Sequence, residues 1–170
     1  MPSITKTPNP EYVRRFNIGR RNAKWAVIMA KVGIRRAIAD TPWPEWQLLT
    51  FTGPKGRESR GVVDLIAIRK DHGKPPSDLK LGDALQIILI QAKGGSAARP
   101  TEEDAKRLRI VALRHGACGI LLASWKKGKA AEFFSLGPHS GGSSKWIPKP
   151  ADDLRKLFGP SKGIDRTGLD

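Results

Sequence analysis

Two nearly apolar segments stand in the middle of the sequence, GVVDLIAIR at residues 61–69 and ALQIILIQAK at residues 84–93. Strands that are apolar on both faces lie centrally in a sheet that helices cover, so we expect two central strands here. Three polar residues interrupt them: Asp64 in the first segment, and Gln91 and Lys93 at the end of the second. A carboxylate inside an apolar strand is unfavourable without a partner, which makes these residues candidates for a site.

A long helix is expected before these strands, over residues 18–39, because apolar residues recur there three or four positions apart. The residues of its expected apolar face are Trp25, Ile28, Met29, Val32 and Ile38. Pro42 and Pro44 then end the helix, and a further strand is expected over residues 46–52. Residues 1–14 are expected to form a flexible N-terminal arm, since prolines gather near the start of the chain.

A second helix is expected after Pro100, where Thr101 and Asp104 are spaced as a capping box and Gly116 marks the end. The remaining expected elements are strands at 118–125 and 130–136, a Gly/Ser-rich loop at 137–144 and a short helix at 150–158. This order predicts an α/β fold with a central mixed sheet flanked by helices. We expect the core to span residues 15–136, followed by a loop, short helix and tail at 137–170.

The charge of the chain points to a polyanionic partner. It has 31 Lys+Arg against 16 Asp+Glu, a formal net charge of +15, which favours nucleic acid as the partner. The expected phosphate contacts are Arg20, Arg21, Lys24, Arg99, Lys126 and Lys127. The single Cys118 excludes an internal disulfide and Cys-rich zinc ligation. No apolar run long enough to span a bilayer is present, so we expect no membrane partner and an intracellular location, in the cytoplasm or nucleoid.

The three polar residues of the central strands suit phosphodiester hydrolysis. Side chains alternate along a strand, so Gln91 and Lys93 point to the same face, and Asp64 joins them if the two strands are neighbours. Mg²⁺ prefers oxygen ligands, which the Asp64 carboxylate, the Gln91 side-chain oxygen and the Ala92 carbonyl can supply. Lys93 would orient a water molecule or stabilise charge on the phosphate. Mn²⁺ is an alternative cation for the same ligands.

This arrangement resembles the core motif of the PD-(D/E)XK nuclease superfamily, which has a restriction-endonuclease-like fold. The resemblance covers roughly residues 15–136 and rests on Asp64 in the second strand, with Gln91 and Lys93 in the third. It implies an α-β-β-β-α-β core, a magnesium-dependent endonuclease and hydrolysis of DNA in preference to RNA. Asp64, Gln91 and Lys93 would then be the catalytic residues, with Asp64 and Gln91 as metal ligands.

Two features depart from the family's pattern. Gln91 replaces the acidic residue of the motif, although a Q-x-K version is similar to restriction enzymes of the Mrr type. Many members also place a Glu in the first helix, where this chain has Asn22 or Ala23 instead. Glu58, just before the second strand, is a substitute candidate. The departures leave open a catalytically inactive nucleic-acid-binding protein of the same fold, and a basic module that binds a protein partner. A homodimer is also compatible with the sequence.

Overall fold

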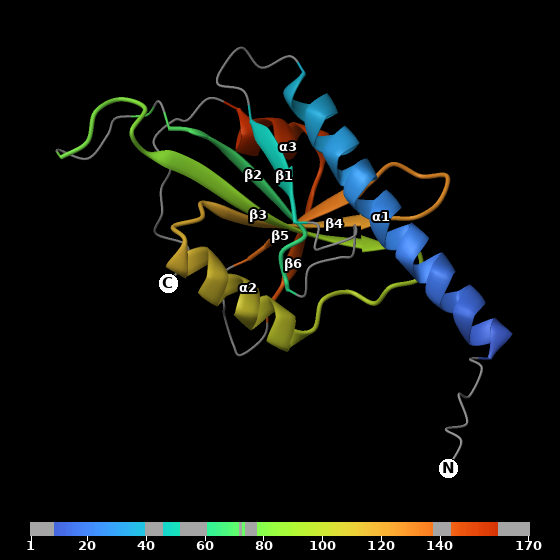
Figure 1. The fold of residues 1–170 in the computed structure, drawn as a ribbon. Coiled ribbons are helices and arrows are strands. Elements are labelled where there is room, and N and C mark those ends of the chain that lie inside the picture. Colours follow the sequence, from blue (N-terminus) through green and yellow to red (C-terminus); the bar gives the residue numbers. More distant parts are fainter. Residues whose placement is uncertain are drawn as a thin grey trace.

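A mixed β-sheet forms the centre of the molecule, and helices pack against both of its faces (Figure 1). The computed structural model describes residues 9–39, 46–51, 61–71, 73, 78–137 and 144–159. Within these residues six strands form one sheet: β1 (Gln47–Thr50), β2 (Leu65–Lys70), β3 (Leu85–Gly94), β4 (Gly119–Trp125), β5 (Glu132–Leu136) and β6 (Trp146–Lys149). The three helices of the same residues are α1 (Pro10–Ile38), α2 (Glu102–Arg114) and α3 (Ala151–Phe158).

The strands lie in the sheet in chain order, which is the α/β arrangement expected from the sequence. β1, β2 and β3 form an antiparallel meander, and β3 pairs in parallel with β4. Helix α2 makes the connection between these two parallel strands, and β5 and β6 continue as antiparallel neighbours. Strand β6 was not expected. It has four residues and contains Pro148, which an edge strand tolerates because one side of it is unpaired.

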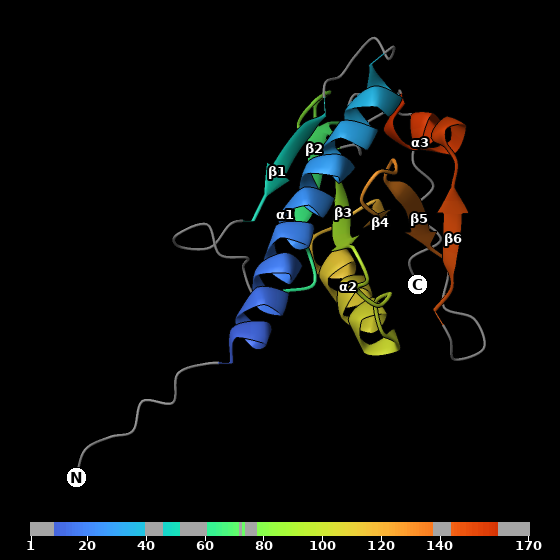
Figure 2. The same ribbon diagram turned by 90° about the vertical axis from the view of Figure 1, so that its right-hand side faces the viewer.

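The helices divide into two layers. Helices α1 and α3 share one apolar cluster with the sheet, in which Ile34 and Phe158 pack with residues of β2, β3 and β4. Helix α2 packs on the opposite face (Figures 1 and 2). There Leu108 and Ala112 form an apolar cluster with Leu89 of β3. Because Phe158 of α3 lies in the main cluster, the core extends beyond residue 136 to include the C-terminal helix. Among the described helices, none combines the length and apolar character that crossing a membrane would require.

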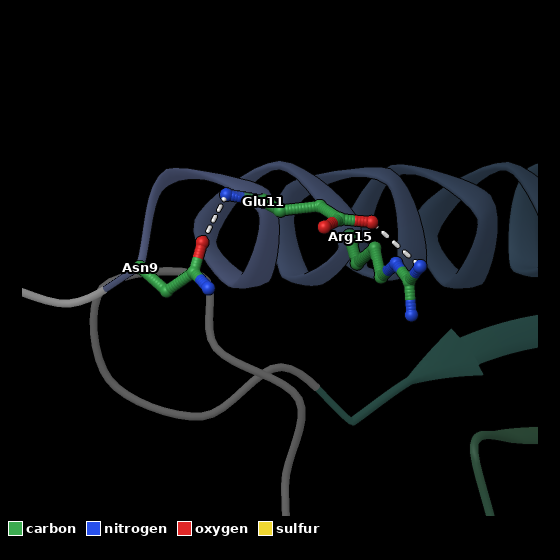
Figure 3. Close-up of polar contacts among 3 residues, drawn as sticks. All are labelled: Asn9, Glu11 and Arg15. Carbon is green, nitrogen blue, oxygen red and sulfur yellow. Dashed lines mark hydrogen bonds and ion pairs between the residues drawn. The ribbon is translucent and has the colours of Figure 1, made fainter.

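Helix α1 begins at Pro10 rather than near residue 18, so part of the expected arm is helical. The Asn9 side chain caps the helix by accepting a hydrogen bond of 2.9 Å from the Glu11 N–H, and the Glu11 carboxylate pairs with Arg15 at 2.6 Å (Figure 3). Pro10 stands at the first helical position, where its missing N–H has no consequence. An Asn cap followed by Pro and an acidic residue is a common beginning of a helix. The sequence-based expectation missed it because the neighbouring prolines were interpreted as part of a flexible arm.

The face that α1 buries also differs from the expected one. Its buried residues are Ala26, Ala30, Ile34 and Ala37, whereas Trp25 and Ile28 are exposed. The reason is the short distance between helix and sheet: a Cβ added to Gly94 would collide with the Asn22 carbonyl oxygen. Only small side chains fit such a contact, so Ala26 rather than Trp25 faces Gly94 there.

Helix α2 starts as the sequence indicates. The Thr101 side chain accepts a hydrogen bond of 3.1 Å from the Asp104 N–H, and the Asp104 carboxylate accepts one of 3.2 Å from the Thr101 N–H. This capping box satisfies two N–H groups that the first turn of a helix leaves without partners. The chain leaves the helix through Gly116, whose φ of 60° favours glycine.

Candidate functional site

Asp64 lies immediately before β2 and is bound to β3 through both its backbone and its side chain. Its N–H donates to the Ile90 carbonyl oxygen at 3.0 Å, and its carboxylate accepts from the Ala92 N–H at 2.7 Å. These two contacts fall on either side of Gln91. The expectation that the two apolar segments are neighbouring strands is therefore confirmed, and Asp64 is fixed beside the polar end of β3.

Gln91 is the most deeply buried of the three candidate residues, with 4% of its surface exposed. Its side-chain oxygen has no hydrogen-bond donor among the residues that the structure describes. Lys93 lies two positions further along β3, on the same side of the strand, and is half-buried. A buried carbonyl oxygen without a donor is unfavourable by roughly 1–3 kcal/mol, so this position gains free energy from any ligand that binds the oxygen.

The three residues line one cavity of about 600 Å³ at the end of β3. Its wall also includes side chains of α1 and of the segment after β3: Arg15, Ile18, Asn22, Ala23, Ser96 and Ala97. The structure thus brings Asp64, Gln91 and Lys93 together, as their positions on neighbouring strands suggested. Their roles in catalysis stay predictions. Glu58, the fourth candidate, lies outside the described residues.

Two glycines after Lys93 allow α1 to form a wall of this cavity. A Cβ on Gly94 would collide with the backbone of Asn22, and a Cβ on Gly95 would lie 2.5 Å from the Asn22 side-chain nitrogen. Gly95 also has a φ of 68°, which other residues rarely adopt. The backbone that approaches these glycines closely is that of α1 at Asn22.

Arg15 is a site residue that the sequence did not indicate. With the arm expected to end at residue 14 and the helix expected to start near residue 18, Arg15 fell between the two. The structure places it one turn before Ile18 and two turns before Asn22, on the face of α1 that lines the cavity. The sequence signal that could have identified Arg15 is its spacing of three residues from Ile18 and seven from Asn22, which places the three on one helix face. This spacing is meaningful only if Asn9 is interpreted as the cap of the helix.

The donor set suits a hard cation more than a transition metal. Asp64 offers a carboxylate and Gln91 a buried amide oxygen without a donor, and oxygen ligands are those that Mg²⁺ prefers. Within the described segments no group of three or more His, Cys, Asp or Glu residues could hold a metal. A magnesium ion at this site would therefore rely on few protein ligands and on water, which is common for this cation.

The side chains of the expected phosphate contacts are all exposed. Most of them lie on α1 or on the turn after β4, near the end of β3 where the cavity is. Arg20, Arg21 and Lys24 lie on α1. The Gly95 N–H donates to the Trp125 carbonyl oxygen at 2.9 Å, so the turn that begins with Lys126 and Lys127 leaves the sheet beside the cavity. The guanidinium of the last expected contact, Arg99, covers the Phe134 ring at 4.8 Å.

Trp125 and Trp146 both have packing roles. Trp125 is buried and stacks on Trp25 with ring centroids 6.3 Å apart. Trp146 belongs to β6 and packs against the apolar cluster under α2.

A larger cavity of about 750 Å³ lies between α1, β5 and α3. Its wall combines apolar side chains such as Met29, Val32, Phe133 and Leu154 with the charged residues Arg36, Arg99, Glu132, Lys149 and Arg155. The smaller cavity is the candidate site because it is the one that holds Asp64, Gln91 and Lys93 together. No protein-family model matches this chain, and a search of curated proteins found no similar sequence.

Proposed function

We propose that this protein is a magnesium-dependent endonuclease that hydrolyses phosphodiester bonds, preferentially in DNA, with a divergent core of the PD-(D/E)XK type. The observation that carries the proposal is the buried Gln91 oxygen without a donor, beside Asp64 and Lys93 on one cavity wall. The order of the described elements, with a helix, three antiparallel strands, a helix and a parallel strand, is compatible with the α-β-β-β-α-β core that this proposal requires.

Asp64 and Gln91 would hold the cation. When bound, Mg²⁺ supplies positive charge that polarises the phosphate and lowers the pKa of a coordinated water. The Ala92 N–H donates to the Asp64 carboxylate and so fixes its orientation toward the end of β3 before any ligand binds. A fixed carboxylate loses little conformational freedom when it meets a cation, which favours binding by a small number of ligands.

Lys93 and Arg15 would act on the phosphate itself. Both line the cavity, and a phosphate that meets Arg15 would compete with the Glu11 carboxylate that pairs with it at 2.6 Å. Lys93, close to Gln91 on β3, would stabilise the negative charge that develops during hydrolysis. Arg15 belongs to the part of the wall that α1 forms, where it would hold the same or the adjacent phosphate.

The same charges give weight to a second candidate, a nucleic-acid-binding protein without catalysis. The described cavity wall carries Lys93 and Arg15 against the single carboxylate of Asp64. Such a site attracts phosphate without a cation, and a single carboxylate binds Mg²⁺ less strongly than two would.

The first prediction tests catalysis with plasmid and single-stranded DNA in Mg²⁺, Mn²⁺ or EDTA. We expect cleavage with either cation and none with EDTA. Replacing Asp64→Asn or Lys93→Met should lower the cleavage rate by at least about 10²-fold, the scale of losing one catalytic group. DNA binding in EDTA should persist in both variants, because the basic surface is unchanged.

Asp152→Asn is the matched control, because Asp152 is an exposed carboxylate on α3, far along the chain from the site. It should cleave like the parent protein. If both site variants also cleave at the parent rate, the site is misplaced. If the parent protein binds DNA but never cleaves it, the non-catalytic candidate is correct.

A further inference from the structure

The N-terminal half of α1 extends beyond the strands, as Figures 1 and 2 both show. Every described residue of the helix up to Arg20 is exposed. Two of them are aromatic: Tyr12 has 66% and Phe16 has 54% of its surface accessible. Large exposed aromatic side chains on a helix that otherwise packs against the sheet indicate a surface that binds a partner molecule.

The direction of these two side chains follows from helix geometry. Tyr12 precedes Ala30, and Phe16 precedes Ile34, by 18 residues, which is five turns at 3.6 residues per turn. Ala30 and Ile34 are buried against the sheet. Tyr12 and Phe16 therefore lie on the face of α1 that meets the strands, continued past the end of the sheet and toward the side that holds the cavity.

The aromatic face continues directly into the candidate site. Gly19, one turn after Phe16, lines the cavity, and so does Arg15 next to Phe16. At 1.5 Å per residue, the axial distance from Gly19 back to Tyr12 is about 10 Å. That distance corresponds to about three nucleotide steps at 3.4 Å per step.

The chemistry of this face suits nucleobases. The Tyr12 and Phe16 rings lie 6.4 Å apart with an angle of 16° between their planes, and the Arg20 guanidinium lies 5.8 Å from the Phe16 centroid. Nearly parallel aromatic faces beside a cation are the elements with which proteins stack unpaired bases. The charge of the helix agrees: α1 has eight Lys or Arg residues and one acid, Glu11, which pairs with Arg15.

That charge also argues against a second copy of this chain as the partner. Two α1 helices brought together would place like charges opposite each other, which is repulsive. A polyanion with flat aromatic groups could pair with the positive charges of α1 and stack on its aromatic rings. In a duplex, neighbouring base pairs cover the base faces and leave only their edges in the grooves, so the rings require unpaired bases.

We propose that Tyr12 and Phe16 stack on unpaired bases within about three nucleotides of the phosphate in the cavity. The inference rests on the proposed function and specifies its substrate: a strand with a single-stranded segment next to the cleaved bond. Arg15 and Arg20 then hold the phosphates between the stacked bases and the site.

The test measures binding in EDTA, where no cleavage interferes. Three ligands of equal length are compared: a single strand, the same strand with abasic nucleotides in place of its bases, and a duplex. The variant is Tyr12→Ala with Phe16→Ala, which keeps the helix because alanine is the strongest helix former. The control is Ile110→Ala with Leu113→Ala, which removes two exposed apolar side chains from α2.

We expect the aromatic variant to bind the single strand at least about tenfold more weakly, on the scale of base stacking. Its affinity for the abasic strand should be unchanged, because the phosphates are the same. The α2 control should bind all three ligands like the parent. Phe16→Trp should retain the affinity for the single strand, since it keeps an aromatic ring at this position.

Two results would overturn the inference. One is an unchanged single-strand affinity in the aromatic variant, or an equal loss on the intact and abasic strands. The other is a parent protein that sediments as a dimer and becomes monomeric in the variant, which would make this face an interface between copies. Cleavage of duplex in Mg²⁺ is measured separately. Its persistence in the aromatic variant would leave the nuclease proposal intact, and its absence from the parent would remove that proposal without affecting base stacking.

Discussion

The two ends of the β2–β3 pair each bury polar side chains, with opposite results. At one end Arg69 of β2 lies opposite Gln86 of β3, and both are buried. At the other end Asp64 lies beside Gln91. The first pair is enclosed by protein, whereas the second faces a cavity.

The Arg69 end is a structural junction. The Arg69 Nε donates to the Gln86 Oε1 at 2.6 Å, and its Nη1 donates to the Phe158 carbonyl oxygen at 3.2 Å. Trp46 donates to the same carbonyl at 2.8 Å, and the guanidinium lies 4.3 Å from the Trp46 ring centroid. Burial lowers the pKa of Arg69 from its ordinary value, and nearby Cys118 and Asp71 act in the opposite direction. These contacts attach the end of α3 to the sheet.

The two ends of the β2–β3 pair differ in whether a cavity lies beside the buried polar residues. Gln86 also has a buried nitrogen without a partner among the described residues, so an unsatisfied atom alone does not identify a site. What differs at Gln91 is its position, because the residue lines a cavity whose wall also contains a carboxylate and two cationic side chains. Gln91 belongs to the wall of a cavity, whereas Gln86 is enclosed by the fold.

The largest stability effect should come from the junction. Arg69→Met leaves the Gln86 oxygen without its donor and removes the contact with Trp46, so the free energy of unfolding should fall by about 2–4 kcal/mol. Lys70→Met, at the exposed next position, should change it by less than about 0.5 kcal/mol. Urea unfolding of both variants measures the difference. Equal, small effects would mean that Arg69 does not hold α3 in place.

A smaller effect should come from the glycine contact at the site end. Gly94→Ala forces α1 away from β3, and we expect a loss of about 1–3 kcal/mol in the free energy of unfolding. Gly19→Ala is the matched variant: its added Cβ meets no atom within 4 Å, so it should stabilise the helix by roughly 0.5–1 kcal/mol. Thermal unfolding should show a lower melting temperature for Gly94→Ala and a higher one for Gly19→Ala. A neutral Gly94→Ala would show that α1 is not closely packed there.

The smallest and most diagnostic effect concerns the two glutamines. Gln91→Leu removes a buried acceptor that has no donor, so it should raise the free energy of unfolding by about 1 kcal/mol while cleavage is lost. Gln86→Leu removes the acceptor of a buried guanidinium, so it should lower the same quantity by about 1–3 kcal/mol. A destabilising Gln91→Leu would mean that Gln91 belongs to the fold, as Gln86 does, and not to the site.

Much of the fold could be predicted because the signals were local. The two apolar segments indicated central strands, the Thr101–Asp104 spacing indicated a capped helix, and the structure confirms both. The short C-terminal helix is confirmed as well. Periodicity and capping depend on residues a few positions apart, so one sequence is enough to recognise them. Asp64, Gln91 and Lys93 stood out for the same reason, as polar residues in apolar strands.

Other features were decided only by contacts between distant parts of the chain. Arg69 is the last residue of the apolar segment 61–69. Nothing near it in the sequence shows that its guanidinium donates a hydrogen bond to the Phe158 carbonyl oxygen. The buried face of α1 follows from the Asn22–Gly94 contact, which overrides the larger apolar residues of the helix. The sequence by itself therefore determined the order of the elements and the polar residues of the central strands. The tertiary structure alone decided which helix face lines the cavity and which buried polar residues belong to its wall, because both depend on packing between residues far apart in the chain.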